Sequence, residues 1–252
     1  MDSPVTLAID IGGTGLKADA LDPDGHMLVD RVRTPTAYPC PPDALISALR
    51  RLVAPLPAFD RVSAGFPGVV RGGLVLSAPH FVTVAGPGSH IDPALVQAWD
   101  HFDLAGTLER TWQRPTRVLN DADLQGLDVV SGRGVELVVT LGTGVGTAIF
   151  EDGRLGPHLE LAHHPFRKGE SYNEQLGAAA RKRIGNKRWN RRLGKAIKTL
   201  RALTLFDHLY IGGGNAEHAD LPFPDDVTVI GPNAGILGGL KLWTTDATGP
   251  VN

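Results

Sequence analysis

Residues 7–17 read LAIDIGGTGLK, and residues 138–149 repeat the same layout as VVTLGTGVGTAI. Each segment is an apolar run, a glycine-rich turn and a second run, which predicts two strands joined by a tight turn. Glycine reaches positive φ angles and places no side chain over the turn, so backbone amides there can point at phosphate oxygens, with threonine hydroxyls beside them. Two such hairpins predict two halves of the chain that face each other across a phosphate-binding cleft.

The composition is that of an ordinary globular protein. The 252 residues are 42% hydrophobic and 21% charged, with a net charge of −2, so the chain forms one large domain or two ordinary ones. The charge implies no overall attraction to nucleic acid or membranes. Cys40 is the single cysteine, which excludes an internal disulfide and fits a reducing compartment. With no secretory signal and no apolar run of about 18 residues, the sequence predicts a cytoplasmic protein.

Strands and helices alternate along the chain, which predicts an α/β fold. Expected strands and hairpins cover residues 5–34, 61–66, 116–119, 136–155, 207–211 and 227–230. Expected helices cover residues 43–53 (capped by Asp43), 104–112, 174–206 (interrupted near Gly185) and 233–243. We expect an N-terminal α/β domain over residues 1–114, joined by the C-terminal helix 233–243. A second α/β domain covers residues 115–232, and residues 244–252 form a loose tail.

Two carboxylates stand at the ends of apolar strands. Asp10 precedes the first glycine turn, where it would hold Mg²⁺ through water or simply cap the turn. Asp121 follows the strand Val118-Leu119, at a position suited to a base that accepts a proton from a hydroxyl during phosphoryl transfer. Asn120 offers both a donor and an acceptor for a sugar hydroxyl. A plain helix N-cap is the alternative for this pair, and Asp123 is taken as a surface or cap residue.

Other polar segments follow the second hairpin. The turn at residues 142–146 precedes a strand, so it is not the dinucleotide fingerprint, and no P-loop motif occurs in the chain. The glycines 212–214 would let a nucleotide approach the backbone, or form a simple loop. A cluster of His158, Glu160, His163 and His164, with Glu170 and Glu174 downstream, suits directional bonds to sugar hydroxyls. Its spacing does not support a metal site, and a surface loop remains the alternative.

Residues 181–198 carry nine lysines and arginines and no acid. Such a run is usually a solvated helix face. In a chain of near-neutral charge it indicates a track for a polyanion, either nucleic acid or inorganic polyphosphate.

Six motifs, taken in order, resemble those of the ROK sugar kinases, and the resemblance covers residues 7 to about 243. They are Asp10-Ile11-Gly12-Gly13-Thr14, Gly65-Phe66-Pro67-Gly68, Asn120-Asp121-Ala122-Asp123, the sequence LGTGVG at 141–146, Glu160-Leu161-Ala162-His163 and Gly212-Gly213-Gly214. The basic run makes the chain look most like the polyphosphate glucokinases within that family.

The resemblance implies an actin-like ATPase (ribonuclease H-like) fold, with two α/β domains hinged around a central cleft and pairing as homodimers. It implies transfer of a phosphoryl group from polyphosphate, ATP or both to the 6-hydroxyl of glucose, with Mg²⁺. Asp121 would be the catalytic base, and the sugar would contact Asn120, Glu160, His163 and Glu174. The phosphate- or nucleotide-binding residues would be Asp10 (beside Mg²⁺), Gly12, Gly13, Thr14, Lys17, Thr143, Gly144, Gly213 and Gly214. Polyphosphate would follow Arg188, Arg191 and Arg192.

Three departures from the family pattern bear on this reading. The cysteine-rich zinc motif of most ROK proteins is missing, as it is in polyphosphate glucokinases, so no zinc site is expected. Ala162 replaces a glycine, and His80 stands where a sugar-binding asparagine is often found. Glu170 competes with Glu174 for the sugar. The alternatives are a kinase for mannose or an N-acetylated hexosamine, or a sugar-binding regulator without turnover. We expect neither a membrane nor a nucleic-acid partner.

Overall fold

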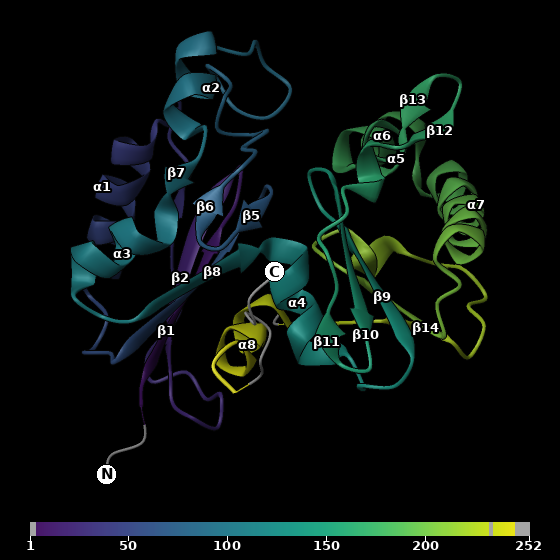
Figure 1. Ribbon diagram of the computed structural model, residues 1–252. Coiled ribbons are helices and arrows are strands. Elements are labelled where there is room, and N and C mark those ends of the chain that lie inside the picture. Colours follow the sequence, from purple (N-terminus) through teal and green to yellow (C-terminus); the bar gives the residue numbers. More distant parts are fainter. Residues whose placement is uncertain (1–3, 232–233, 245–252) are drawn as a thin grey trace. The chain divides into compact units, whose positions relative to one another are not determined.

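The computed structural model describes residues 4–231 and 234–244, with the backbone alone at 234–236 (Figure 1). Contacts divide the described chain into two compact units, one made of residues 4–124 and 235–244 and the other of residues 125–234. The expected tail at 244–252 lies outside the described residues except for Thr244, and so does Asn233, the expected first residue of the last helix.

The first unit contains a five-stranded sheet with the order β3-β2-β1-β4-β8. Its strands are β1 (Thr6–Ile11), β2 (Gly15–Leu21), β3 (Val32–Pro35), β4 (Arg61–Phe66) and β8 (Thr116–Asn120). β1 and β2 form the first expected hairpin, antiparallel, with Asp10 opposite Lys17. β4 and β8 run parallel to β1, so the carboxyl ends of these three strands lie at one edge of the sheet.

Helices cover both faces of this sheet. They are α1 (Pro42–Val53), α2 (Pro93–Trp99), α3 (Leu104–Trp112), the start of α4 (Asp121–Val129) and α8 (Ala234–Lys241). A small sheet of β5 (Val70–Arg71), β6 (Leu74–Val75) and β7 (Phe102–Asp103) completes the unit. Alternation along β1 sends Leu7, Ile9 and Ile11 to the main core, whereas Ala8 packs on the other face with Leu240 of α8.

The C-terminal segment is fastened to the first unit by a tryptophan. The Trp243 indole donates to Ser63 Oγ at 2.8 Å. The guanidinium groups of Arg61 and Arg117 lie 5.3 Å and 4.6 Å from its ring centroid, within the range of cation–π attraction. The expected joining of the C-terminal helix to the N-terminal domain therefore has a specific anchor.

The second unit repeats the topology of the first. Its sheet has the order β11-β10-β9-β14-β15, built from β9 (Val135–Leu141), β10 (Val145–Glu151), β11 (Arg154–Leu155), β14 (His208–Gly212) and β15 (Val227–Val229). With strands numbered by their order within each sheet, both sheets read 3-2-1-4-5. In both, the first three strands are antiparallel and the last two run parallel to the first. The duplication expected from the twin hairpins extends to whole sheets.

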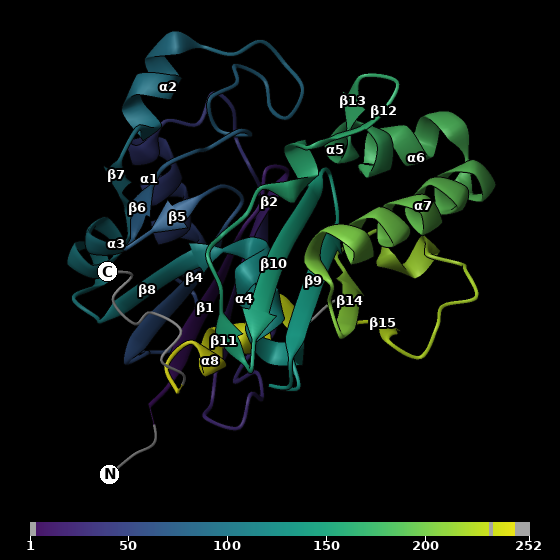
Figure 2. The same cartoon turned by 45° about the vertical axis from the view of Figure 1, so that its right-hand side comes forward.

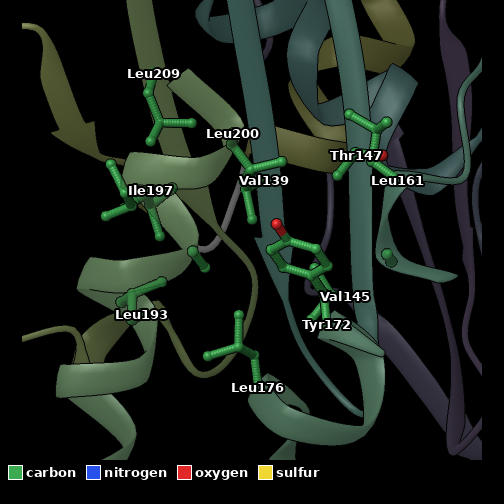
Figure 3. Close-up of a pocket in the computed structure, with 13 residues that line it drawn as sticks. Val139, Val145, Thr147, Leu161, Tyr172, Leu176, Leu193, Ile197, Leu200 and Leu209 are labelled. Atoms are coloured by element: carbon green, nitrogen blue, oxygen red, sulfur yellow. The ribbon is translucent and has the colours of Figure 1, made fainter. Parts of the chain in front are cut away.

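Helices α5 (Tyr172–Leu176) and α7 (Asn186–Thr204) pack on one face of this sheet, and α6 (Ala178–Ile184) lies between them in the chain (Figure 2). The loops hold η1 (Leu161–His163), β12 (Pro165–Arg167), β13 (Glu170–Ser171) and η2 (Ala216–His218). Figure 3 shows a pocket between the sheet and α7, lined by residues such as Val139, Leu193 and Ile197. Its lining carries no charged side chain, so it belongs to the hydrophobic interior.

Four details differ from the sequence prediction. Residues 26–31 contribute only a bridge at Met27, and the third strand is instead β3. The division between units falls inside α4 rather than near residue 114, because β8 pairs with β4 in the first sheet. Asp43 lies in the first turn of α1, and Pro41 is the N-cap. The long helix expected at 174–206 is also interrupted at Gly177, which separates α5 from α6.

A fully buried carboxylate supports the second unit. Glu136 accepts hydrogen bonds from the amides of Ser131 and Gly132 and from the Tyr210 hydroxyl. Burial alone would raise the pKa of Glu136, but these hydrogen bonds outweigh it and the pKa lies below its usual value. The ionised group therefore stabilises the fold above the unfolded-state pKa, and this contribution is lost as pH falls through the folded-state pKa.

We expect Glu136→Gln to lower the free energy of unfolding by about 1–3 kcal/mol at pH 7, because an amide nitrogen cannot accept the hydrogen bonds of a carboxylate oxygen. Urea unfolding from pH 7 to pH 3 measures this. The difference between the two proteins should shrink as pH falls below about 4.5, and a difference that does not change with pH would contradict the assignment.

Within residues 4–231 and 234–244, no helix combines the length and the apolar character needed to cross a membrane.

Candidate functional site

The candidate residues of the first unit gather at one edge of its sheet. The register places Asp10 beside Gly65, and Gly65 beside Leu119. Asp121 follows two residues after Leu119, at the start of α4. Since neighbouring strands lie about 4.8 Å apart, Asp10 and the end of β8 are roughly 10 Å apart across β4. The first glycine turn and Asp121 therefore share this edge.

Asp121 stands at a helix N-terminus, where the backbone amides favour negative charge. Its Oδ1 accepts a hydrogen bond from the amide of Ala122 at 2.9 Å. Gly65 lies next to it, since a Cβ at Gly65 would be 3.6 Å from Asp121 Cα and 3.3 Å from Leu124 Cδ2. The start of α4 therefore lies directly beside β4, at van der Waals distance from Gly65.

Both polar atoms of the Asn120 side-chain amide form hydrogen bonds within the protein. Nδ2 donates to the carbonyl of Gly68 at 3.0 Å, and Oδ1 accepts from the amides of Ala122 and Asp123 at 2.7 Å and 3.3 Å. The residue is buried. It caps α4 and ties the loop after β4 to it, so a sugar contact from Asn120 requires exchange of one of these bonds.

Hydrogen bonds to its carbonyl groups fix the conformation of the first glycine turn. The Gly12 amide donates to Gly15 O at 3.0 Å, while Thr36 Oγ1 and the Tyr38 hydroxyl donate to the carbonyls of Gly12 and Gly13. The amides of Gly13 and Thr14 have no hydrogen-bond acceptor in the described part of the chain. Two unsatisfied donors in a rigid turn are the arrangement needed to bind a phosphate.

We expect Tyr38→Phe to weaken this turn. The Phe ring keeps the packing on Phe81 but leaves the Gly13 carbonyl without its 2.6 Å partner. The loss should be about 1 kcal/mol in the free energy of unfolding, with a higher KM for the phosphoryl donor and an unchanged KM for the sugar. Denaturant unfolding and steady-state kinetics measure these quantities, and an equal rise in both KM values would contradict a role confined to the turn.

Asp10 forms an ion pair with Lys17. Its Oδ2 lies 2.8 Å from Lys17 Nζ, and Oδ1 has no hydrogen-bond partner among the described residues. Mg²⁺ commonly binds proteins through one or two carboxylates and retains several waters. A half-exposed carboxylate with one available oxygen fits an ion held through water, whereas the Lys17 ammonium disfavours direct coordination.

The second glycine turn is held in the same manner. The Gly142 amide donates to Gly144 O at 2.9 Å, and the Gly142 carbonyl accepts from Ala178 N and Asn215 Nδ2. Asn173 Oδ1 accepts from the amide of Val145 at 2.8 Å. The amides of Thr143 and Gly144 have no acceptor among the described residues. Both hairpins therefore present two consecutive donors and an exposed threonine, Thr14 or Thr143.

The first glycine after β14 packs directly against Leu141, the residue before the second turn. Gly213 adopts φ +83°, and a Cβ there would lie 2.5 Å from Leu141 O. Asn215 links the two segments, because it donates to Gly142 O and its Oδ1 accepts from Arg181 Nε at 3.0 Å. The first arginine of the basic run therefore holds the second phosphate turn through Asn215, a role that the sequence did not reveal.

Two of the three histidines expected to cluster with Glu160 lie beside it, whereas His164 Nδ1 lies 2.9 Å from the Pro165 carbonyl. Glu160 Oε1 lies 3.3 Å from His158 Nε2, and Oε2 lies 3.7 Å from His163 Nε2. The hydrogen bond with His158 lowers the pKa of Glu160, which keeps the carboxylate ionised. His163 is exposed, and His158 is mostly buried. The arrangement presents an anionic acceptor beside imidazole groups, as hydrogen bonding to a polyol requires.

Glu174 and Glu170 have different surroundings. Glu174 forms a capping box with Ser171 at the start of α5. Hydrogen bonds from Ser171 lower the pKa of Glu174, and the nearby charge of His163 adds to that effect. Glu170 accepts a hydrogen bond from Gln175 Nε2. Of the two glutamates, Glu174 is the one that feels the charge of His163. Its Oε2 accepts the hydrogen bonds of the cap from Ser171.

Two further residues differ from or add to the sequence prediction. Asp123, expected as a surface or cap residue, is 2% exposed and lies in the first turn of α4, so the surface alternative is wrong. The His80 imidazole packs on the first turn, since a Cβ at Gly13 would lie 2.8 Å from its Cγ. Burial lowers the pKa of His80, which favours the neutral ring. His80 therefore forms a wall of the first phosphate turn.

The basic run divides over two helices. α6 begins at the second glycine turn, because Ala178 N donates to the Gly142 carbonyl. Gly185, at φ +76°, separates α6 from α7. Arg188 and Arg192 lie one helical turn apart, whereas Arg191 lines an open groove with Glu217 and other residues. Of the three arginines expected to form one track, Arg191 lines this groove and Arg188 and Arg192 do not, although Arg188 and Arg191 are three residues apart on α7.

Comparisons with known proteins agree with this arrangement. The sequence profile of the ROK family matches residues 6–168. A polyphosphate glucokinase from Mycobacterium tuberculosis is 27% identical over 259 residues, covering 95% of this chain and 91% of that protein. An N-acetylmannosamine kinase from Escherichia coli is 36% identical over 155 residues, covering 60% of this chain and 48% of that protein.

Among solved structures, the inorganic polyphosphate/ATP-glucomannokinase from Arthrobacter sp. strain KM superposes with a TM-score of 0.81 at 29% identity. The match covers 96% of this chain and 100% of that one. The duplicated 3-2-1-4-5 sheets and this similarity establish the actin-like ATPase fold. With the profile matching well over half of its length, the chain belongs to the ROK family.

Proposed function

We propose that this protein is a sugar kinase that transfers a phosphoryl group from polyphosphate, ATP or both to the 6-hydroxyl of glucose. The observation that carries the proposal is the pair of matched glycine turns, each with two consecutive unsatisfied amide donors and an exposed threonine hydroxyl. The similarity to a polyphosphate glucokinase over 95% of the chain supports the same reaction.

Asp121 accepts the proton of the attacking hydroxyl in this proposal. Its place at the N-terminus of α4 favours the ionised carboxylate, which is the form that a base requires. Since the Ala122 amide already holds Oδ1, the carboxylate has a fixed orientation. Positioning of the acceptor and stabilisation of phosphate charge supply most of the remaining catalysis in phosphoryl transfer.

The amides of Gly13, Thr14, Thr143 and Gly144 bind donor phosphate oxygens, with Lys17 adding positive charge at the first turn. Mg²⁺, when bound with the donor near Asp10, neutralises charge that develops on the transferred group. Gly213 and Gly214 would lie beside a bound nucleotide, where Gly214 leaves open space and Gly213 packs on Leu141. Use of magnesium and assembly as a homodimer stay predictions.

The sugar is bound by Glu160 and His163 together with either Glu174 or Glu170. Substituting each of these two glutamates in turn shows which one contacts the sugar. Glu174→Gln preserves the capping box, because glutamine also serves at that position. We expect it to raise the KM for glucose about tenfold through loss of a charged acceptor, and Glu170→Gln to have less than a threefold effect. Steady-state kinetics at saturating donor measure both, and the reverse order would assign the contact to Glu170.

A kinase for an N-acetylated hexosamine is the second candidate, favoured by the 36% identity to an N-acetylmannosamine kinase. That match covers only 60% of this chain, which is why glucose is preferred. A panel of glucose, mannose, N-acetylmannosamine and N-acetylglucosamine at equal concentration separates these candidates. The highest kcat/KM for an N-acetylated sugar would replace glucose.

Assays with Mg²⁺ and glucose, in which the donor is either ATP or long-chain polyphosphate, test the proposed donors. Product formation with polyphosphate is the expected result. Product with ATP alone would remove polyphosphate from the proposal, and binding of sugar with no product from either donor would contradict the kinase itself.

A further inference from the structure

Arg192 of α7 has three other arginines around it, which come from β12, α6 and α7 itself. The strand pairing sets Arg167 of β12 opposite Glu170 of β13. Glu170 accepts a hydrogen bond from Gln175, and the Gln175 carbonyl lies 3.5 Å from Arg192 Nη1. Arg188 lies one turn before Arg192 on α7. Figure 2 shows the β12–β13 hairpin beside α5, with α6 and α7 following in the chain.

Arg192 lies within electrostatic range of the other three arginines. Burial lowers the pKa of Arg192, and the charges of Arg167, Arg183 and Arg188 lower it further, against the opposing effect of Glu170. None of the four arginines forms an ion pair with the part of the chain that the structure describes. Four cations beside one carboxylate repel one another, and a bound polyanion would relieve that repulsion.

Other basic residues of the run have different neighbours. Arg201, near the end of α7, pairs with Asp226 through both of its terminal nitrogens. Lys187 and Arg191 line the groove that also contains Glu217 and Asp220. Acidic side chains near these positions disfavour an anion there. The cluster formed by Arg167, Arg183, Arg188 and Arg192 is thus the part of the run best suited to bind one.

This arginine cluster is connected to the second phosphate turn by a short helix. α6 begins with Ala178 N donating to Gly142 O, and Arg183 lies in its last turn. Seven helical residues span about 10 Å, so a chain of several phosphates held at the turn would extend to Arg183. Trp189, the aromatic residue within the run, is fully buried. A nucleic-acid site usually stacks bases on exposed aromatic rings, which disfavours nucleic acid here.

We propose that Arg167, Arg183, Arg188 and Arg192 bind the distal phosphates of a long polyphosphate chain whose near end occupies the Gly142–Gly146 turn, and that Arg191 takes no part. The proposal rests on the proposed use of polyphosphate as a donor. The sequence predicted that polyphosphate follows Arg188, Arg191 and Arg192. The proposed site instead combines Arg188 and Arg192 of α7 with Arg183 of α6 and Arg167 of β12.

Two double variants that remove equal charge from neighbouring positions test this site. R188Q/R192Q removes half of the cluster, and K187Q/R191Q changes the adjacent positions on the groove side of the same helix. The first measurement is the Kd for polyphosphate of about one hundred phosphates and for tripolyphosphate, each over a range of salt concentration. The second is the KM for ATP with glucose.

For R188Q/R192Q we expect a loss of affinity for long polyphosphate of tenfold or more. We also expect the slope of log Kd against log salt to fall by roughly 1–2. Affinity for tripolyphosphate and the KM for ATP should change less than threefold, because neither ligand reaches the cluster. K187Q/R191Q should weaken binding of long polyphosphate less than threefold.

Equal losses in the two double variants, or no loss in R188Q/R192Q, would overturn the proposal. So would equal competition for the site by a single-stranded RNA of the same charge. Direct binding separates this inference from the proposed function: turnover of glucose with ATP alone, together with cluster-dependent binding of polyphosphate, would leave the site in place and remove only its role in catalysis.

Discussion

Asp121→Asn should lower kcat for glucose phosphorylation by about 10²–10⁴ while leaving the KM values for glucose and donor within a few-fold. The reason is that an amide cannot accept the proton of the attacking hydroxyl. The substituted side chain still has an oxygen to accept the hydrogen bond of the Ala122 amide, so α4 should begin as before. Steady-state kinetics with the folded variant measure the effect.

Asp43→Asn is the matched control, since Asp43 is also an aspartate in the first turn of a helix of the same unit and is exposed. Its kcat should equal that of the unchanged protein. A kcat for Asp121→Asn within a few-fold of normal, in a protein with unchanged circular dichroism and unfolding midpoint, would show that Asp121 is not the base.

Gly213→Ala should destabilise the second unit by about 3 kcal/mol. An alanine at φ +83° costs about 1–2 kcal/mol, and its Cβ would lie within 2.5–2.8 Å of backbone atoms of Leu141, which cannot move without distorting β9. Since Leu141 precedes the second phosphate turn, the KM for the donor should rise as well. Thermal unfolding should begin about 6–12 °C lower.

Gly214→Ala serves as the comparison for stability. A Cβ at Gly214 would meet no atom within 4 Å, and its φ is not in the left-handed region. Its free energy of unfolding should change by less than about 0.5 kcal/mol. Equal destabilisation by the two substitutions would show that close packing of Gly213 on Leu141 is not what holds this turn.

The glycine turns could be predicted from the sequence because their chemistry is local. Gly12 to Thr14, and Gly142 to Gly144, carry their conformational freedom and their amide donors within a few residues. The doubling of the sheet followed from the same pattern. The groups that hold these turns could not be predicted in this way. Tyr38 and Asn215 lie 25 and 73 residues from the carbonyls that they bind.

The domain boundary and the arrangement of the basic run also depend on long-range contacts, so they could not be predicted from the sequence. β8 was expected to open the second domain, but its pairing with β4 is a long-range contact that no local signal specifies. The basic residues formed one run in the sequence, yet Arg191 lines the groove that contains Glu217 whereas Arg188 and Arg192 do not, and this depends on what packs beside α7. Arg167 and Arg181 acquire their neighbours only through tertiary contacts. Burial of Asp123, expected as a surface or cap residue, could not be predicted because its polarity does not report the packing of α4.

The most direct test of this account is identification of the product formed from glucose, Mg²⁺ and either polyphosphate or ATP by phosphorus NMR. The account predicts glucose 6-phosphate from the unchanged protein and a rate at least one hundred times lower with Asp121→Asn. Phosphate on another hydroxyl, or glucose bound without any phosphorylated product, would contradict it.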